Sequence, residues 1–353
     1  MTGILVLVTG TGRSGTSTIA GSLFHLGLSV PGPYLGANAS NPKGFFESSW
    51  ALKFHKQIER AARINDFDAQ PSAFERAQHA VTPELRSRLI AFLGRHAGEG
   101  VQIVVKDPRS VWVQRLWKEA AAEVGLDIGY LSMLRHPAEV VGSRATYYAA
   151  NADTAQRIHY EICSVARWVN SSLVSERETR GEMRTFVLYA DLLEDWRSAL
   201  TRVRDELHLT FNSDLVPGGR HPVDEFIDPS LRRLKVTWDD LRIPAELQEI
   251  AEEMWSALLR LRASPSSDDG TLRDLDELSR RYAHLFADAQ AISHDAIDEA
   301  RREGYHKGAR KARKEQMGKR STPASASPTV AQASGRELLR AVRERVGRRI
   351  RRR

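Results

Sequence analysis

Apolar runs alternate along the chain with segments whose apolar residues recur at helical spacing. Four runs read as buried strands: Ile4–Val8, Val101–Val105, Ile128–Leu134 and Thr185–Leu188. Helical patterns lie between or after them, at 16–26, 48–63, 82–97, 110–124, 137–148, 154–178, 191–207 and 244–263. This alternation predicts βαβ units, and therefore an α/β fold with a parallel sheet and helices on both faces.

The C-terminal part of the chain follows other patterns. Residues 212–243 are rich in Pro and Gly and read as irregular, and SPSSDDG at 264–270 reads as a linker. Apolar residues then recur in steps of four and three, which is a short heptad seam, at Leu278, Tyr282, Leu285, Ala289, Ile292 and Ala296. We expect an α/β domain at 1–263, a helical extension at 264–320, a disordered linker at 321–334 and a tail helix at 335–353.

The charge of the chain is concentrated near its C-terminus. The net charge is +7, yet residues 301–320 and 335–353 each contribute +7, so residues 1–300 carry −7. An acidic body makes nucleic acid an unexpected partner. The tail at 335–353 combines an apolar stripe with arginines, which favours an anionic membrane surface. The seam predicts either packing on the body or self-association through 272–300.

The sequence favours a reducing compartment. It has a single cysteine, Cys163, and therefore no internal disulfide. It shows no basic, apolar leader and no run of about 20 apolar residues. We expect a cytoplasmic protein, which the basic tail could bring to the inner face of the membrane.

The first apolar run leads into a turn rich in glycine and hydroxyl residues, TGTGRSGTST at 9–18. Gly10, Gly12 and Gly15 allow a tight turn whose N–H groups point inward, toward the start of the next helix. The spacing is nearly that of a nucleotide-binding P-loop, but Thr16 stands where an NTPase has lysine. The turn is predicted to hold a phosphate through Arg13, Ser14, Gly15, Thr16 and Ser17. The alternative is a glycine-rich turn without a ligand.

A second phosphate site is indicated by LRHPAEVVGSR at 134–144. Arg135 follows a predicted strand, Pro137 is suited to begin a helix, and Ser143 lies on that helix. Ligands of open α/β sheets bind at the carboxyl ends of the strands, so Arg135 and Ser143 could hold a phosphate near the first turn.

Together these segments resemble the sulfotransferase superfamily, which uses 3′-phosphoadenosine 5′-phosphosulfate (PAPS). The resemblance implies that Arg13-Ser14-Gly15-Thr16 holds the 5′-phosphosulfate and that Arg135 and Ser143 hold the 3′-phosphate. VLYADLLED at 187–195 is similar to a third family segment, with Ala190 in place of the usual Glu. NPKGFFE at 41–47 and VKDPRS at 105–110 are similar to segments of bacterial members.

The resemblance implies transfer of a sulfuryl group from PAPS to a hydroxyl, with a carbohydrate or glycolipid as the acceptor class and no metal requirement. Arg13 and Lys106 would stabilise the charge that grows on the leaving nucleotide. Glu47 is our first choice as the base that accepts the proton of the acceptor, and it lies where the resemblance puts the acceptor. Asp107, His55 and His136 are the other candidates, and Arg109 is a further candidate cation.

Two other functions are compatible with the sequence. The first is a P-loop kinase or NTPase, with Asp107 after a buried strand as its metal-binding carboxylate. The second is a protein of the same fold that binds a nucleotide without catalysis. No residue pattern in the sequence identifies the acceptor.

Overall fold

The computed structural model contains one parallel sheet with the strand order β2-β1-β3-β4. The strands are β1 (Gly3–Thr9), β2 (Gln102–Lys106), β3 (Leu126–Leu134) and β4 (Arg184–Leu188). All four coincide with predicted strands, and the predicted α/β class is confirmed. The structure describes residues 2–38, 41, 43–148, 152–216, 218–228, 236–264 and 269–320, with only the backbone for 146–148 and 314–320.

The strand register brings the carboxyl ends of the strands to one edge. Val8 pairs with Lys106 on one side, and Thr9 pairs with Ser132 on the other. The chain passes from β1 to β2 on one side and returns to β3 on the other side of β1. The connections therefore diverge above the end of β1, the position where open α/β sheets bind ligands.

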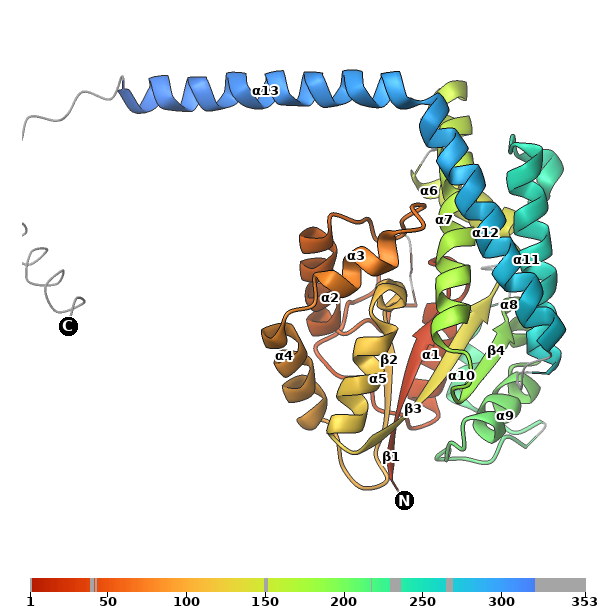
Figure 1. The fold of residues 1–353 in the computed structure, drawn as a ribbon. Coiled ribbons are helices and arrows are strands. Elements are labelled where there is room, and N and C mark those ends of the chain that lie inside the picture. Colours follow the sequence, from red (N-terminus) through yellow and green to blue (C-terminus); the bar gives the residue numbers. More distant parts are fainter. Residues whose placement is uncertain are drawn as a thin grey trace, which may run out of the picture. The chain divides into compact units, whose positions relative to one another are not determined.

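Both faces of the sheet are covered by helices (Figure 1). Leu5 and Leu7 of β1 pack in a core with four helices, while Val6 and Val8 face a second core with four others. The first set is α2 (Ser49–Ala62), α3 (Ala73–His79), α4 (Pro83–Gly94) and α5 (Gln114–Glu123). The second set is α1 (Thr16–His25), α8 (Tyr189–Glu194), α9 (Trp196–Glu206) and α10 (Pro222–Phe226).

A third core lies against β3 and β4. Leu134 and Phe186 pack there against four further helices. These are α6 (Pro137–Tyr148), α7 (Thr154–Glu178), α11 (Ala245–Ala263) and α12 (Asp269–Ile292).

Several segments differ from the predicted elements, and helix α3 has no predicted counterpart. The single helix expected at 191–207 is divided at Asp195, whose carboxylate accepts the N–H groups of Arg197 and Ser198 and so begins α9. The helix expected at 110–124 begins as a 3₁₀ turn, η1 (Pro108–Trp112), before α5. The irregular region 212–243 contains α10 and a second 3₁₀ turn, η3 (Trp238–Asp240).

The chain forms two compact units, Met1–Asp288 and Ala289–Arg353. The division lies within α12, beyond the boundary expected at 263, because the first half of α12 belongs to the third core. Leu275, Leu278 and Tyr282 are buried, and the Tyr282 hydroxyl lies 2.6 Å from the carbonyl oxygen of Ala69. The first half of the predicted seam is therefore covered by its own chain.

The second unit contains α13 (His294–Arg320). Ion pairs one turn apart support this helix, including Arg301 with Asp298 at 2.8 Å and Lys307 with Glu303 at 2.7 Å. Among the described helices none has the length and apolar character needed to cross a membrane. The linker expected at 321–334 and the tail helix expected at 335–353 lie outside the described residues.

Candidate active site

The turn after β1 has the conformation that its glycines permit. The φ angles of Gly10, Arg13 and Gly15 are +107°, +76° and +89°. A side chain on Gly15 would place its Cβ 2.2 Å from Cδ2 of Tyr189, so the ring of Tyr189 packs directly on this backbone. Arg13 adopts the left-handed region without being glycine, a strain of order 1–3 kcal/mol that is typical of ligand-binding turns.

The hydroxyl groups of the turn and the start of α1 form a polar lining. The Ser14 hydroxyl lies 2.7 Å from that of Thr11, and the Ser14 N–H donates to the Thr11 carbonyl. Helix α1 begins at Thr16 after Gly15, which has no side chain to cap the first N–H groups. Uncapped amides at a helix start, next to hydroxyls, suit an anion.

The two phosphate motifs predicted from the sequence meet in space. The Nε–H of Arg13 donates to the hydroxyl of Ser143 on α6 at 3.2 Å. Arg135, at the end of β3, donates to the carbonyl oxygen of Arg13 at 3.0 Å. The guanidinium of Arg135 lies over the ring of Tyr189, 5.0 Å from its centroid. Residues more than 120 positions apart therefore form one cationic cluster at the carboxyl end of β1, where the connections to β2 and β3 diverge.

Glu139 is a neighbour of Arg135 that the sequence analysis missed. Its carboxylate accepts from the Nε–H of Arg135 at 2.9 Å. The two residues are four positions apart at the start of α6, so helical spacing was the signal that could have found the pair. Arg135 is buried, and Glu139 supplies an anion next to it.

Glu47 and Lys106 form a buried ion pair at the neighbouring strand end. The Nζ of Lys106 lies 2.5 Å from Oε1 of Glu47, and the residues are only 2% and 6% exposed. Lys106 is the last residue of β2, while Glu47 directly precedes α2 and its N-cap, Ser48. The Leu35 N–H fixes the backbone of Glu47 by donating to its carbonyl at 2.9 Å. The end of β2 and the loop before α2 thus bring together a cation and a carboxylate that are 59 positions apart.

Asp107 is fully buried, and its carboxylate oxygens already have partners. Oδ2 accepts from His55 at 2.9 Å, and Oδ1 accepts from the backbone N–H and a side-chain N–H of Arg109. Burial opposes ionisation, but the contacts with His55 and Arg109 outweigh it and hold the pKa of Asp107 well below its usual range. Both ring nitrogens of His55 are engaged as well, because Nε2 accepts from Trp117 at 2.9 Å.

His136 contacts helix α11 and the 3₁₀ turn η3. Its Nε2 donates to Glu252 of α11 at 3.0 Å, and its ring makes edge contacts with Trp238 and Trp255. Its Nδ1 accepts the N–H of Ala138 at 3.3 Å. These contacts attach the start of α6 to α11 and leave neither ring nitrogen available to a hydroxyl.

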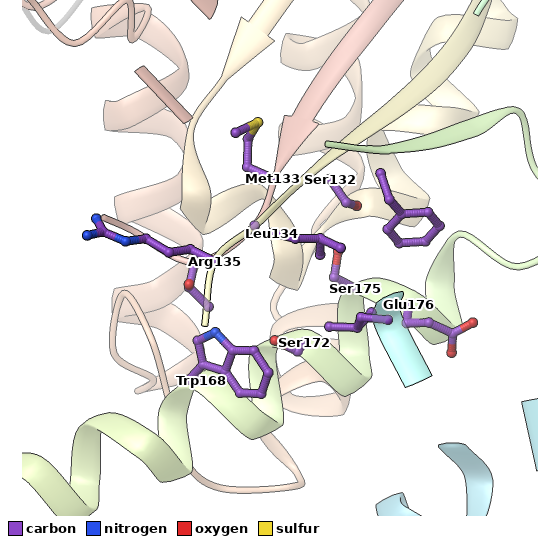
Figure 2. Close-up of a pocket in the computed structure, with 12 residues that line it drawn as sticks. Ser132, Met133, Leu134, Arg135, Trp168, Ser172, Ser175 and Glu176 are labelled. Carbon is purple, nitrogen blue, oxygen red and sulfur yellow. The ribbon is translucent and has the colours of Figure 1, made fainter. Parts of the chain in front are cut away.

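Two small cavities adjoin the turn. One, of about 20 Å³, lies between the end of β3 and α7, and Figure 2 shows Ser132 and Arg135 on one side and Trp168, Ser172 and Ser175 on the other. It has room for about one water molecule. The second, also about 20 Å³, lies at the start of α1 and is lined by Ser17, Thr18, Asn41, Lys43, Gly44, Tyr189, Leu193, Phe226 and Asp228. Within the described ranges, no cluster of three or more His, Cys, Asp or Glu side chains could hold a metal ion.

Comparison with known proteins gives structural similarities alone. No family model matches the chain, and no curated protein sequence matches it. The chain is similar to the sulfotransferase domain of the Synechococcus PCC 7002 olefin synthase, with 19% identity over 73% of this chain and 94% of that domain and a TM-score of 0.41. It is also similar to the sulfotransferase domain of the curacin biosynthetic pathway, with 16% identity, 73% and 98% coverage and a TM-score of 0.39.

Proposed function

We propose that the protein is a sulfotransferase that moves a sulfuryl group from PAPS to a hydroxyl of a carbohydrate or glycolipid. The observation that carries the proposal is the meeting of Arg13, Ser143 and Arg135 beside the turn after β1. A donor with phosphate at both the 5′ and the 3′ position needs two such anion sites close together. A nucleoside triphosphate has no 3′-phosphate for Arg135 and Ser143.

The strand ends supply the groups that the transfer needs. The bond between sulfur and the oxygen bridging to the 5′-phosphate breaks, and a bond from sulfur to the acceptor oxygen forms. Arg13, Lys106 and the amides of the turn provide positive charge where the bridging oxygen becomes negative. Glu47 accepts the proton of the acceptor hydroxyl. Lys106 lies 2.5 Å from Glu47, which supports a shared site for the leaving group and the acceptor.

The acceptor class rests on the resemblance of NPKGFFE at 41–47 and VKDPRS at 105–110 to segments of bacterial sulfotransferases. A carbohydrate hydroxyl is a weak acid, so its proton leaves only as the new bond forms, and a carboxylate is a sufficient base.

Binding of the product nucleotide, adenosine 3′,5′-bisphosphate (PAP), tests the proposal. We expect PAP to bind without divalent metal and, at about 100 times its Kd, to stabilise the fold by about 2.7 kcal/mol. Adenosine 5′-phosphate should bind much more weakly, and Arg135→Ala should remove most of this preference. Arg115→Ala, which removes a surface arginine paired with Glu178, is the matched control.

Calorimetry with both nucleotides decides among the alternatives. Equal affinity for PAP and adenosine 5′-phosphate contradicts the proposal. ATP binding that requires Mg²⁺ favours a kinase or NTPase instead. Tight PAP binding without sulfuryl transfer to any member of a glycan, glycolipid and phenol panel favours a non-catalytic nucleotide-binding protein.

A further inference from the structure

A chain of buried hydrogen bonds leads from the core of the protein to Arg109, which forms an ion pair with Glu47. It begins at Trp117 on α5, passes through His55 on α2 and reaches Asp107 at the end of β2. These three residues are at most 1% exposed. Buried networks in which every member has a partner hold their side chains in one arrangement.

The donors and acceptors of this chain fix the tautomer of His55. An indole N–H can only donate, so the Nε2 of His55, 2.9 Å from Trp117 Nε1, is the acceptor and carries no hydrogen. The hydrogen of a neutral ring is then on Nδ1, which donates to Asp107 Oδ2 at 2.9 Å. His55 thereby orients the Asp107 carboxylate and leaves Oδ1 for Arg109.

Arg109 is the last member of the chain. Asp107 Oδ1 accepts from its backbone N–H at 3.0 Å and from its NH1 group at 2.8 Å, while Asp66 accepts from NH2 at 2.7 Å. The guanidinium is therefore held at both terminal nitrogens. Its NH1 lies 3.7 Å from Oε2 of Glu47, the oxygen that Lys106 does not bind.

We propose that Arg109 is a positioning residue that orients the Glu47 carboxylate, and that Trp117, His55 and Asp107 form the relay that holds Arg109 in place. Lys106 and Arg109 contact different oxygens of Glu47, so together they determine the rotation of its carboxylate. The positioning of a base by a few tenths of an ångström strongly affects proton transfer. The inference rests on the proposed function, because Glu47 is the base in that proposal.

Two substitutions of His55 separate orientation from packing. His55→Asn retains an N–H donor near the position of Nδ1, whereas His55→Leu fills a similar volume without a donor. The rate to be measured is hydrolysis of PAPS to PAP and sulfate, in which water replaces the acceptor and Glu47 takes its proton. We expect His55→Leu to lower this rate about 100-fold and His55→Asn to recover most of the loss. PAP affinity should stay unchanged in both.

Equal rate losses in the two variants, or a loss of PAP affinity that parallels the rate, would overturn the relay. Trp117→Phe is a second probe, since it removes only the donor to Nε2 while keeping an aromatic ring. It should lower the rate in the same direction as His55→Leu, and an unchanged rate contradicts the relay. Thermal unfolding and circular dichroism establish that each variant is folded.

Nuclear magnetic resonance gives a readout that does not depend on activity. In ¹⁵N-labelled protein, His55 should carry its hydrogen on Nδ1. The Nη1 hydrogens of Arg109, which donate to Asp107 and are assigned with Arg109→Lys, should exchange slowly in the wild type and in His55→Asn but rapidly in His55→Leu. Hydrogen on Nε2, or rapid Arg109 exchange in the wild type, overturns the relay. If the wild type neither binds PAP nor hydrolyses PAPS, the proposed function is wrong. The spectra then still test the relay, because they do not depend on activity.

Discussion

Glu47 and Glu59 are buried glutamates that both face Arg109 but have different surroundings. Glu47 has Lys106 at 2.5 Å and Arg109 at 3.7 Å. The carboxylate of Glu59 has Arg109 at 4.0 Å, and its Oε1 has no hydrogen-bond partner among the described residues. Burial, followed by the nearby charge of Asp66, raises the pKa of Glu59 to about 8. Glu59 therefore keeps its proton at pH 7, while Glu47 is held in an ion pair.

Matched substitutions of these two residues test the role of Glu47. We expect Glu47→Gln to lower kcat by roughly 10²–10⁴, because an amide cannot accept the proton of the acceptor. PAP affinity should change little, whereas the free energy of unfolding should fall, because buried Lys106 loses the charge of its partner. Glu59→Gln replaces a protonated carboxyl by a group of the same shape, so kcat at pH 7 should stay near the wild-type value. A Glu47→Gln enzyme with normal kcat would eliminate Glu47 as the base.

Glu59 also predicts a pH dependence of stability. Its pKa of about 8 in the folded protein exceeds the value of about 4.3 in an unfolded chain. Between these values the unfolded chain loses the proton and the folded one keeps it. Stability is therefore lowered progressively as the pH rises from about 4.3 to 8, by up to about 1.4 kcal/mol per pH unit. Urea unfolding of Glu59→Gln at pH 5 and pH 8 should show an advantage over the wild type that grows with pH, and a constant difference would contradict the assignment.

At the scale of elements, helix α1 is fitted closely to the segments that surround it. Gly15 at its start approaches Tyr189 of α8, and Gly21 in its middle approaches two aromatic rings. A Cβ on Gly21 would lie 2.2 Å from Cζ of Phe226 and 2.7 Å from Cε2 of Phe46. The second turn of α1 therefore needs glycine, although glycine weakens a helix by about 1 kcal/mol relative to alanine.

Alanine at two helical glycines should have opposite effects. Gly21→Ala should lower the free energy of unfolding by about 1–3 kcal/mol, since the new methyl group overlaps Phe226 and Phe46. Gly94→Ala, at an exposed position of α4, meets only Val124 at 3.8 Å and should raise it by about 0.5–1 kcal/mol. Urea denaturation measures both. A gain in stability for Gly21→Ala would show that α1 is not packed this closely.

At the scale of the whole molecule, the first compact unit is completed by α12. Its buried face continues the core of α7 and α11, and Tyr282 links it to the backbone of Ala69. Leu275 and Leu278 are at most 2% exposed. The unit that folds together therefore extends well past the end of α11.

Truncation should reveal this boundary. The chain 1–288 should unfold cooperatively with a midpoint close to that of the full chain. The chain 1–263 loses three buried hydrophobic side chains, each worth about 1.5–3 kcal/mol, a large part of a typical total of about 5–15 kcal/mol. We expect it to aggregate or to melt at much lower temperature in differential scanning calorimetry. Equal midpoints for the two truncated chains would move the boundary back to residue 263.

Much of the fold was predictable because its signals are local. The apolar runs that became β1 to β4 are continuous and short, and the patterns at 137–148 and 154–178 matched α6 and α7 at both ends. The missed features depend on single side chains. Asp195 ended one helix and began another by accepting two backbone N–H groups, which a period of apolar residues does not reveal.

The candidate site was predictable only as a set of residue types. Arg13, Arg135 and Ser143 were predicted from their motifs. Glu47 and Lys106 were predicted from two segments that resemble those of bacterial sulfotransferases. The sequence left His55, Asp107 and His136 as further candidates for the base beside Glu47. Their hydrogen bonds to Trp117, Arg109 and Glu252 distinguish them, and Trp117 and Glu252 lie 62 and 116 positions from the histidines that they contact.

The sequence by itself determined the class of fold, the strands and the turn after β1, because hydrophobic period and glycine conformation are properties of neighbouring residues. Only the tertiary structure decided which charges are paired. Parallel strands in register bring Lys106 and Arg135 to one edge, and the helices then bury their partners Glu47 and Glu139 beside them. Such pairing depends on distances across the sheet, and those distances exist only after the chain has folded.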